Sequence, residues 1–85
     1  MNLWFVSGAN SKSTRIIAKV KTEKEAFSEI NKFLDEHNYK SYYIRIWNTE
    51  PHVKRYDVGS YTEFFDLELE NGEEFEDRIK EQNEK

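Results

Sequence analysis

Few side chains in this sequence could carry out catalysis. The histidines are His37 and His52, and there is no cysteine. Ser60, Asp57 and His52 lie close together in the chain and are the residue types of a nucleophilic triad. A triad also needs a rigid turn that exposes the nucleophile and an oxyanion hole, and no nucleophile-elbow motif is present. We therefore expect a protein that is not an enzyme.

Phosphate binding is a second chemistry to consider, at the segment "GANSKST" (8–14). A P-loop needs a second glycine before its lysine, and a helix must follow so that backbone N–H groups cradle the phosphate. Here Ser11 stands in place of the second glycine, and the residues that follow have the alternation of a strand. The segment is therefore predicted to be a hairpin loop and not a nucleotide site.

Metal binding has equally little support. Two histidines fifteen positions apart, without any cysteine, do not make a zinc pattern. The acidic stretch "DLELENGEE" (66–74) contains a glycine but lacks the alternating carboxylate frame of a calcium loop. We expect neither a metal nor a cofactor.

Aromatic and basic residues alternate in the middle of the chain, which is how single-stranded nucleic acid can be bound. Rings stack on bases while Arg and Lys hold phosphates. The net charge of −4 and the absence of an RNP-type motif argue against this function, and the same rings could simply cover one face of a sheet. Nucleic-acid binding is kept as an alternative, with its face formed by Tyr43, Arg45, Trp47, Lys54 and Arg55.

Charge is distributed unevenly along the chain. Residues 1–55 carry ten basic and six acidic side chains, a balance of +4, whereas residues 56–85 carry three and eleven, a balance of −8. An ordered row of carboxylates can dock into a basic groove and be steered there electrostatically, although most charge runs are only solvated surface. The leading hypothesis is a partner-binding acidic surface formed by Glu63, Asp66, Glu68, Glu70, Glu73, Glu74 and Asp77.

The elements that would position these side chains are readable from periodicity. Thr22 and Glu25 have the spacing of a capping box, and an apolar stripe with helical spacing follows them. Asn38 is a plausible end of that helix. Asn71-Gly72 signals a tight turn, and Gly59 a turn or bulge held by side-chain hydrogen bonds. The expected strands are 2–7, 14–20, 40–48, 53–58 and 61–69, and the expected helix is 22–37. Residues 73–85 are expected to form a short second helix, with a sixth strand as the alternative.

This order, β-β-α-β-β-β, predicts an α+β domain. A mainly antiparallel sheet of about five strands would pack on the one main helix. The 85 residues make one domain, in which residues 80–85 form a solvated, frayed tail. No apolar run is long enough to cross a bilayer, and no signal peptide is recognisable, so we expect a cytoplasmic protein that does not bind membranes.

The segments "SYYIRIW" (41–47) and "YDVGSYTEFF" (56–65) carry a family resemblance. They resemble small uncharacterised phage and prophage proteins of Gram-positive bacteria that share a SYYxRxW…DxGSxTxFF pattern. The resemblance spans residues 14–66 and omits the acidic tail. It supplies no catalytic or binding residues, and the family often has histidine where Tyr61 stands.

The resemblance implies an accessory factor that acts in the cytoplasm of a host cell. Together with the charge asymmetry, it favours a non-enzymatic protein that engages a host protein through its acidic surface. Inhibition of a nucleic-acid-handling or defence protein would be the effect. Besides nucleic-acid binding, the remaining alternative is a homo-oligomeric structural or assembly protein that associates through an exposed sheet face or edge.

Overall fold

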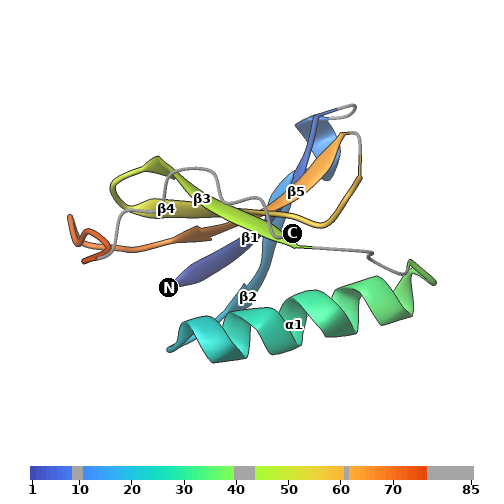
Figure 1. Cartoon of the computed structure of the whole chain (residues 1–85), viewed down its shortest axis with the longest axis horizontal. Coiled ribbons are helices and arrows are strands. Elements are labelled where there is room, and N and C mark those ends of the chain that lie inside the picture. The colour runs from blue at the N-terminus through green and yellow to red at the C-terminus, as the bar shows by residue number, and fades with distance from the viewer. Residues whose placement is uncertain (9–10, 40–43, 61, 77–85) are drawn as a thin grey trace.

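In the part of the chain that the structure describes, one α-helix, one short 3-10 turn and five strands make up the regular structure (Figure 1). The structure is a computed structural model, and it describes residues 1–8, 11–39, 44–60 and 62–76. Within this part of the chain the elements, in order, are β1 (Asn2–Ser7), the 3-10 turn η1 (Ser11–Ser13), β2 (Arg15–Lys19), α1 (Glu23–Glu36), β3 (Arg45–Glu50), β4 (Val53–Asp57) and β5 (Glu63–Glu68).

The strands form a single antiparallel sheet in the order β2-β1-β5-β4-β3. The last strand, β5, therefore lies in the middle, between the β1–β2 hairpin and the β3–β4 hairpin. α1 runs along one face of the sheet (Figure 1). The expected α+β class, with a five-stranded antiparallel sheet and one helix, is confirmed.

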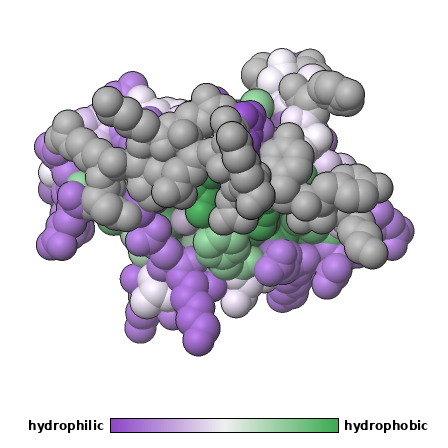
Figure 2. Space-filling model, in the orientation of Figure 1, coloured by the Kyte–Doolittle hydropathy of each residue, from purple (hydrophilic) through white to green (hydrophobic). Residues whose placement is uncertain are grey.

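Period-two alternation makes one sheet face apolar. Along β1 the side chains alternate between half-buried and buried, and β5 does the same from Phe64 onwards. The inward residues lie side by side across the strands, because Phe5 is opposite Phe65 and Phe65 is opposite Tyr56. The helix covers them with Ala26, Ile30 and Leu34. Hydrophilic side chains fringe the outer side of the helix, with hydrophobic residues between helix and sheet (Figure 2).

The caps of α1 explain where it begins and ends. The Thr22 hydroxyl accepts a hydrogen bond from the Glu25 N–H at 3.1 Å, as the capping box predicts. In a capping box the Glu25 carboxylate would accept from the N–H of Thr22. Here it accepts from the N–H of the preceding residue, Lys21, at 3.0 Å. At the other end Asn38 has a φ of 54°, the left-handed conformation that stops a helix. The helix is therefore one residue shorter at each end than the predicted 22–37, and Thr22 and His37 are its cap residues.

Strand limits in the second half of the chain differ from the prediction. β3 continues to Glu50, which pairs with Val53, so that the turn consists of Pro51 and His52 and is shorter than the expected 49–52. Residues 40–43 of the expected strand lie outside the described residues. Residues 73–76 are not helical, and the remainder of the expected C-terminal helix, 77–85, lies outside the described residues, as does the expected tail.

Candidate binding sites

The predicted aromatic and basic face is only partly assembled. Arg45, Trp47 and Arg55 lie on the sheet face opposite the helix, where Trp47 is directly across from Arg55. The Arg45 guanidinium sits 5.5 Å from the centre of the Trp47 ring. Lys54 points to the other face, because neighbouring residues on a strand alternate. Tyr43 lies outside the described residues.

Both arginines of this face are engaged by carboxylates. Arg55 makes a two-pronged pair with Asp66, at 2.8 Å from Nε and 3.0 Å from Nη2. Arg45 donates to Asp57 Oδ2 from Nη2 at 2.7 Å and from Nε at 3.2 Å. The hydrogen bonds that Arg55 donates to Asp66, helped by the negative charge of Asp66 and opposed by burial, raise the pKa of Arg55 above its ordinary value. The two carboxylates therefore already neutralise the positive charges that would bind a phosphate group.

Lys54 is part of the core. Its side chain is 1% exposed, and its Nζ lies 2.8 Å from Glu23 Oε1 and 4.5 Å from the centre of the Phe75 ring. The ammonium thereby joins the sheet to the first turn of α1 and to the segment that follows β5. Lys54 is therefore a buried residue that packs in the core, and it does not lie on the predicted nucleic-acid face.

The predicted acidic surface is divided among three places. Asp66 is bound to Arg55, and Glu68 Oε1 accepts from Trp4 Nε1 at 3.1 Å. Glu63 lies at the opposite end of β5. The three members that follow β5, Glu70, Glu73 and Glu74, are exposed and close together in the chain, whereas Asp77 lies outside the described residues.

A groove beside this last group adds acids that are distant in the sequence. It lies between the beginning of α1 and the segment after β5, and we call it the acidic groove. Its lining residues are Met1, Lys21, Thr22, Glu23, Leu69, Glu73, Glu74, Phe75 and Glu76. Glu23 belongs to the helix. It is about fifty residues away from the other glutamates of the groove, so the sequence did not predict that it lies beside them.

Backbone hydrogen bonds hold the acidic groove in place. The Leu69 N–H donates to the His52 carbonyl at 2.8 Å, and the Phe75 N–H donates to the Pro51 carbonyl at 2.9 Å. Between them the chain turns at Asn71 and Gly72, with φ values of 59° and 75°. The predicted Asn-Gly turn is confirmed, and it brings Glu73 and Glu74 back toward the helix.

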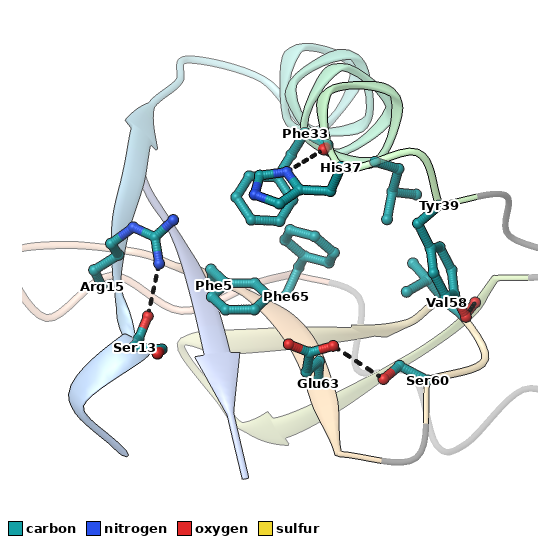
Figure 3. Close-up of a pocket in the computed structure, with 11 residues that line it drawn as sticks. Phe5, Ser13, Arg15, Phe33, His37, Tyr39, Val58, Ser60, Glu63 and Phe65 are labelled. Atoms are coloured by element: carbon teal, nitrogen blue, oxygen red, sulfur yellow. Dashed lines mark hydrogen bonds between the residues drawn. The ribbon is translucent and has the colours of Figure 1, made fainter. Parts of the chain in front are cut away.

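A pocket at the other end of the helix was not predicted. It has a volume of about 360 Å³ and lies between the C-terminal end of α1 and the sheet (Figure 3). We call it the aromatic pocket. Its lining residues are Phe5, Ser13, Arg15, Phe33, Leu34, His37, Tyr39, Val58, Ser60, Glu63 and Phe65. A sequence signal did exist, because Phe33 and His37 are spaced one helical turn apart at the end of the helix.

Two hydrogen bonds hold the chain after β4, where Val58 and Ser60 line the aromatic pocket. The Tyr39 hydroxyl donates to the Val58 carbonyl at 3.2 Å and thus ties the chain after the helix to the sheet. The Gly59 N–H donates to Asp57 Oδ1 at 2.9 Å, with Gly59 at a φ of 91°. The predicted side-chain-held turn at Gly59 is therefore confirmed, and it positions Ser60 at the pocket.

No known protein family, curated protein or solved structure gives a significant match to the chain.

In the part of the chain that the structure describes, no three histidine or carboxylate side chains are grouped as a metal site would require. The helix described here is too short and too polar to span a membrane.

Proposed function

We propose that the protein is a non-enzymatic binding protein that engages a basic surface of a partner protein through the acidic groove. The observation that carries this proposal is the convergence of Glu73, Glu74 and Glu76 on one groove, beside the start of the helix, where Glu23 already pairs with Lys54. Leu69 and Phe75 contribute apolar surface beside them. Carboxylates around an apolar strip favour a partner that presents Lys or Arg next to hydrophobic side chains.

The ion pairs elsewhere support this choice of surface. Asp57 and Asp66 are bound by arginines on the open sheet face, so binding a basic partner there would require breaking those pairs. Glu73 and Glu76 lie on the surface at the acidic groove. The same pairs disfavour the nucleic-acid alternative, because Arg45 and Arg55 would have to exchange a carboxylate for a phosphate.

The resemblance to phage and prophage proteins supplies the proposed setting. The partner would be a host protein in the host cytoplasm, and the bound protein would block a basic surface that otherwise handles nucleic acid. Electrostatic attraction would make association fast and dependent on ionic strength.

The test is an affinity pull-down from a Gram-positive host lysate, with and without nuclease. The variant E73K/E74K/E76K reverses the acidic groove but leaves the Glu23–Lys54 pair intact. Its matched control, D35K/E36K/E50K, makes the same charge change at exposed positions that do not line the groove. Circular dichroism and thermal melting establish that both variants fold.

We expect one stoichiometric protein to survive nuclease treatment, to be lost with the groove variant, and to be retained with the control. Equal retention by both variants would contradict the proposal. Recovery of RNA or DNA in place of a protein would contradict it as well and would favour the open sheet face. An empty eluate together with self-association in light scattering would favour the homo-oligomer.

A further inference from the structure

We propose that the aromatic pocket binds a small zwitterionic ligand that carries an aromatic ring, the chemical class of a free aromatic amino acid. The site lies at the opposite end of α1 from the acidic groove and shares no lining residue with it. The proposal is therefore independent of the proposed protein partner. It rests on a preformed aromatic floor and on two opposite charges at its edges.

The floor of the pocket is a cluster of three phenylalanine rings. The ring centres of Phe5 and Phe33 are 4.9 Å apart, those of Phe33 and Phe65 are 5.4 Å apart, and those of Phe5 and Phe65 are 5.8 Å apart. Each ring comes from a different element, α1, β1 or β5, so the fold holds the cluster together. Aromatic faces and edges favour another ring. A volume near the lower end for small-molecule sites favours a ligand with a single ring system.

Arg15 supplies a cation on one side of this floor (Figure 3). Its guanidinium carbon lies 5.3 Å from the centre of the Phe5 ring and 5.8 Å from that of Phe33. Nη1 donates to the Ser13 carbonyl at 2.9 Å, which fixes the group without neutralising it. Among the described residues, no carboxylate pairs with Arg15, in contrast to Arg45 and Arg55. A guanidinium has five N–H donors, so enough remain to bind a ligand carboxylate.

Glu63 supplies the opposite charge on another side of the floor (Figure 3). Its contact with the Ser60 hydroxyl is long, at 3.4 Å, and no basic residue in the described part of the chain pairs with it. Glu63 of β5 is opposite Ser7 of β1, and Arg15 of β2 is opposite Phe5 of β1. Strand spacings place the two Cα atoms roughly 12 Å apart, close enough for both side chains to reach one ligand between them. A ligand ammonium would meet Glu63, and a second anionic group would be repelled.

The remaining polar groups at the pocket do not supply an alternative charge pair. His37 stacks on Phe33 with ring centres 4.1 Å apart. Its Nδ1 is 2.9 Å from the Phe33 carbonyl and must carry the hydrogen, because a carbonyl can only accept. The Tyr39 hydroxyl is already used by Val58. Recognition of charge therefore falls to Arg15 and Glu63.

The experiment is an NMR titration of the ¹⁵N-labelled protein with L-phenylalanine and three matched compounds. N-acetyl-L-phenylalanine lacks the cation, phenethylamine lacks the carboxylate, and L-alanine lacks the ring. We expect L-phenylalanine to shift the amide signals of residues that line the pocket. It should bind about tenfold more tightly than N-acetyl-L-phenylalanine or phenethylamine, since a charged hydrogen bond contributes this much, and more tightly than L-alanine, which has no ring to pack on the aromatic floor. Equal affinity for all three phenyl compounds, or no shifts at millimolar ligand, would overturn the proposal.

Two variants assign the charges. With Arg15→Gln, L-phenylalanine and phenethylamine should bind equally, and with Glu63→Gln, L-phenylalanine and its N-acetyl form should bind equally. The controls are Lys19→Gln, on the same strand as Arg15 but outside the pocket, and Glu50→Gln, which is exposed at the end of β3. Both controls should leave affinity unchanged. Unchanged discrimination in both pocket variants would overturn the proposal, and if a variant fails to fold, the compound series on the natural sequence still decides it.

Discussion

The two ends of α1 are built from different kinds of contact. At the beginning of the helix, charge enters the packing itself, because Lys54 is buried and pairs with Glu23. At the end of the helix, rings pack against rings, and Phe33 contacts Phe5, Phe65 and His37. There the charges of Arg15 and Glu63 stay at the edge of the aromatic cluster.

The two ends therefore differ in whether the residues that stabilise the fold are also the residues proposed to bind a partner or ligand. At the acidic groove, Glu23 contributes both to the fold and to the lining of the groove, so a change there affects both. At the aromatic pocket, the rings pack against one another, whereas Glu63 and Arg15 are exposed, with the Arg15 guanidinium over the rings of Phe5 and Phe33. The comparison predicts that apolar substitutions are most damaging at the pocket end, and that charge substitutions are most damaging at the groove end.

The largest effect should follow Phe65→Ala, which removes the ring in contact with both Phe5 and Phe33. Phe65 is almost fully buried in the central strand. Truncation leaves a cavity and lost burial that together cost about 3–5 kcal/mol. Urea denaturation should show this loss, whereas Phe64→Ala, on the half-buried face of the same strand, should lose clearly less. Similar losses for both would contradict the importance given to the ring cluster.

The next effect concerns the buried ammonium at the groove end. Glu23→Ala should destabilise the protein by about 1–2 kcal/mol, which is less than for a fully buried pair because Glu23 is 47% exposed. Lys54→Met keeps the side-chain length without the charge and should cost less than Glu23→Ala, or even stabilise the protein. Chemical denaturation of both variants measures the difference. A larger loss for Lys54→Met would show that the charge itself is needed.

A smaller effect isolates the cap from the ion pair at the same end. Thr22→Ala removes the hydroxyl that accepts from the Glu25 N–H and should cost about 1 kcal/mol. Thr22→Ser keeps that acceptor and should stay within about 0.5 kcal/mol of the natural sequence. Thermal melting compares the two variants. If both lost the same stability, the methyl group and not the cap would be responsible.

The smallest effect is expected for an ion pair on the open sheet face. A double-mutant cycle with Arg55→Gln and Asp66→Asn should give a coupling of about 0.5–1 kcal/mol, because both side chains keep some exposure to solvent. Raising the salt concentration should reduce it. The raised pKa of Arg55 keeps the guanidinium charged wherever the fold persists, so its own titration should add no pH dependence at neutral pH. A coupling above about 3 kcal/mol would contradict this expectation, because it would require the ion pair to be shielded from solvent.

Local patterns in the sequence were sufficient for many elements. Thr22 and Asn38 marked the ends of the helix because caps depend on side chains only three or four residues away. The strand predicted over residues 2–7 coincides with β1. The Asn71-Gly72 turn followed from the few residues that adopt the left-handed conformation easily.

The candidate sites depended on contacts that local patterns do not contain. Beside Arg55 in the sequence, Lys54 has the appearance of a surface cation, but it lies in the core, where Glu23, 31 residues away, pairs with it. Arg45 and Arg55 read as free cations until their pairing with Asp57 and Asp66 was visible. Glu63 read as one member of an acidic row, although it lies at the aromatic pocket, at the other end of β5 from Glu68.

The sequence by itself therefore determined the class of fold, the helix and its caps, and the charge of each segment, because these follow from spacing along the chain. Only the tertiary structure decided which charges meet. The insertion of β5 between β1 and β4 joins distant parts of the chain. An ion pair or a pocket is formed by side chains that are close in space, and the order of strands in the sheet sets that proximity.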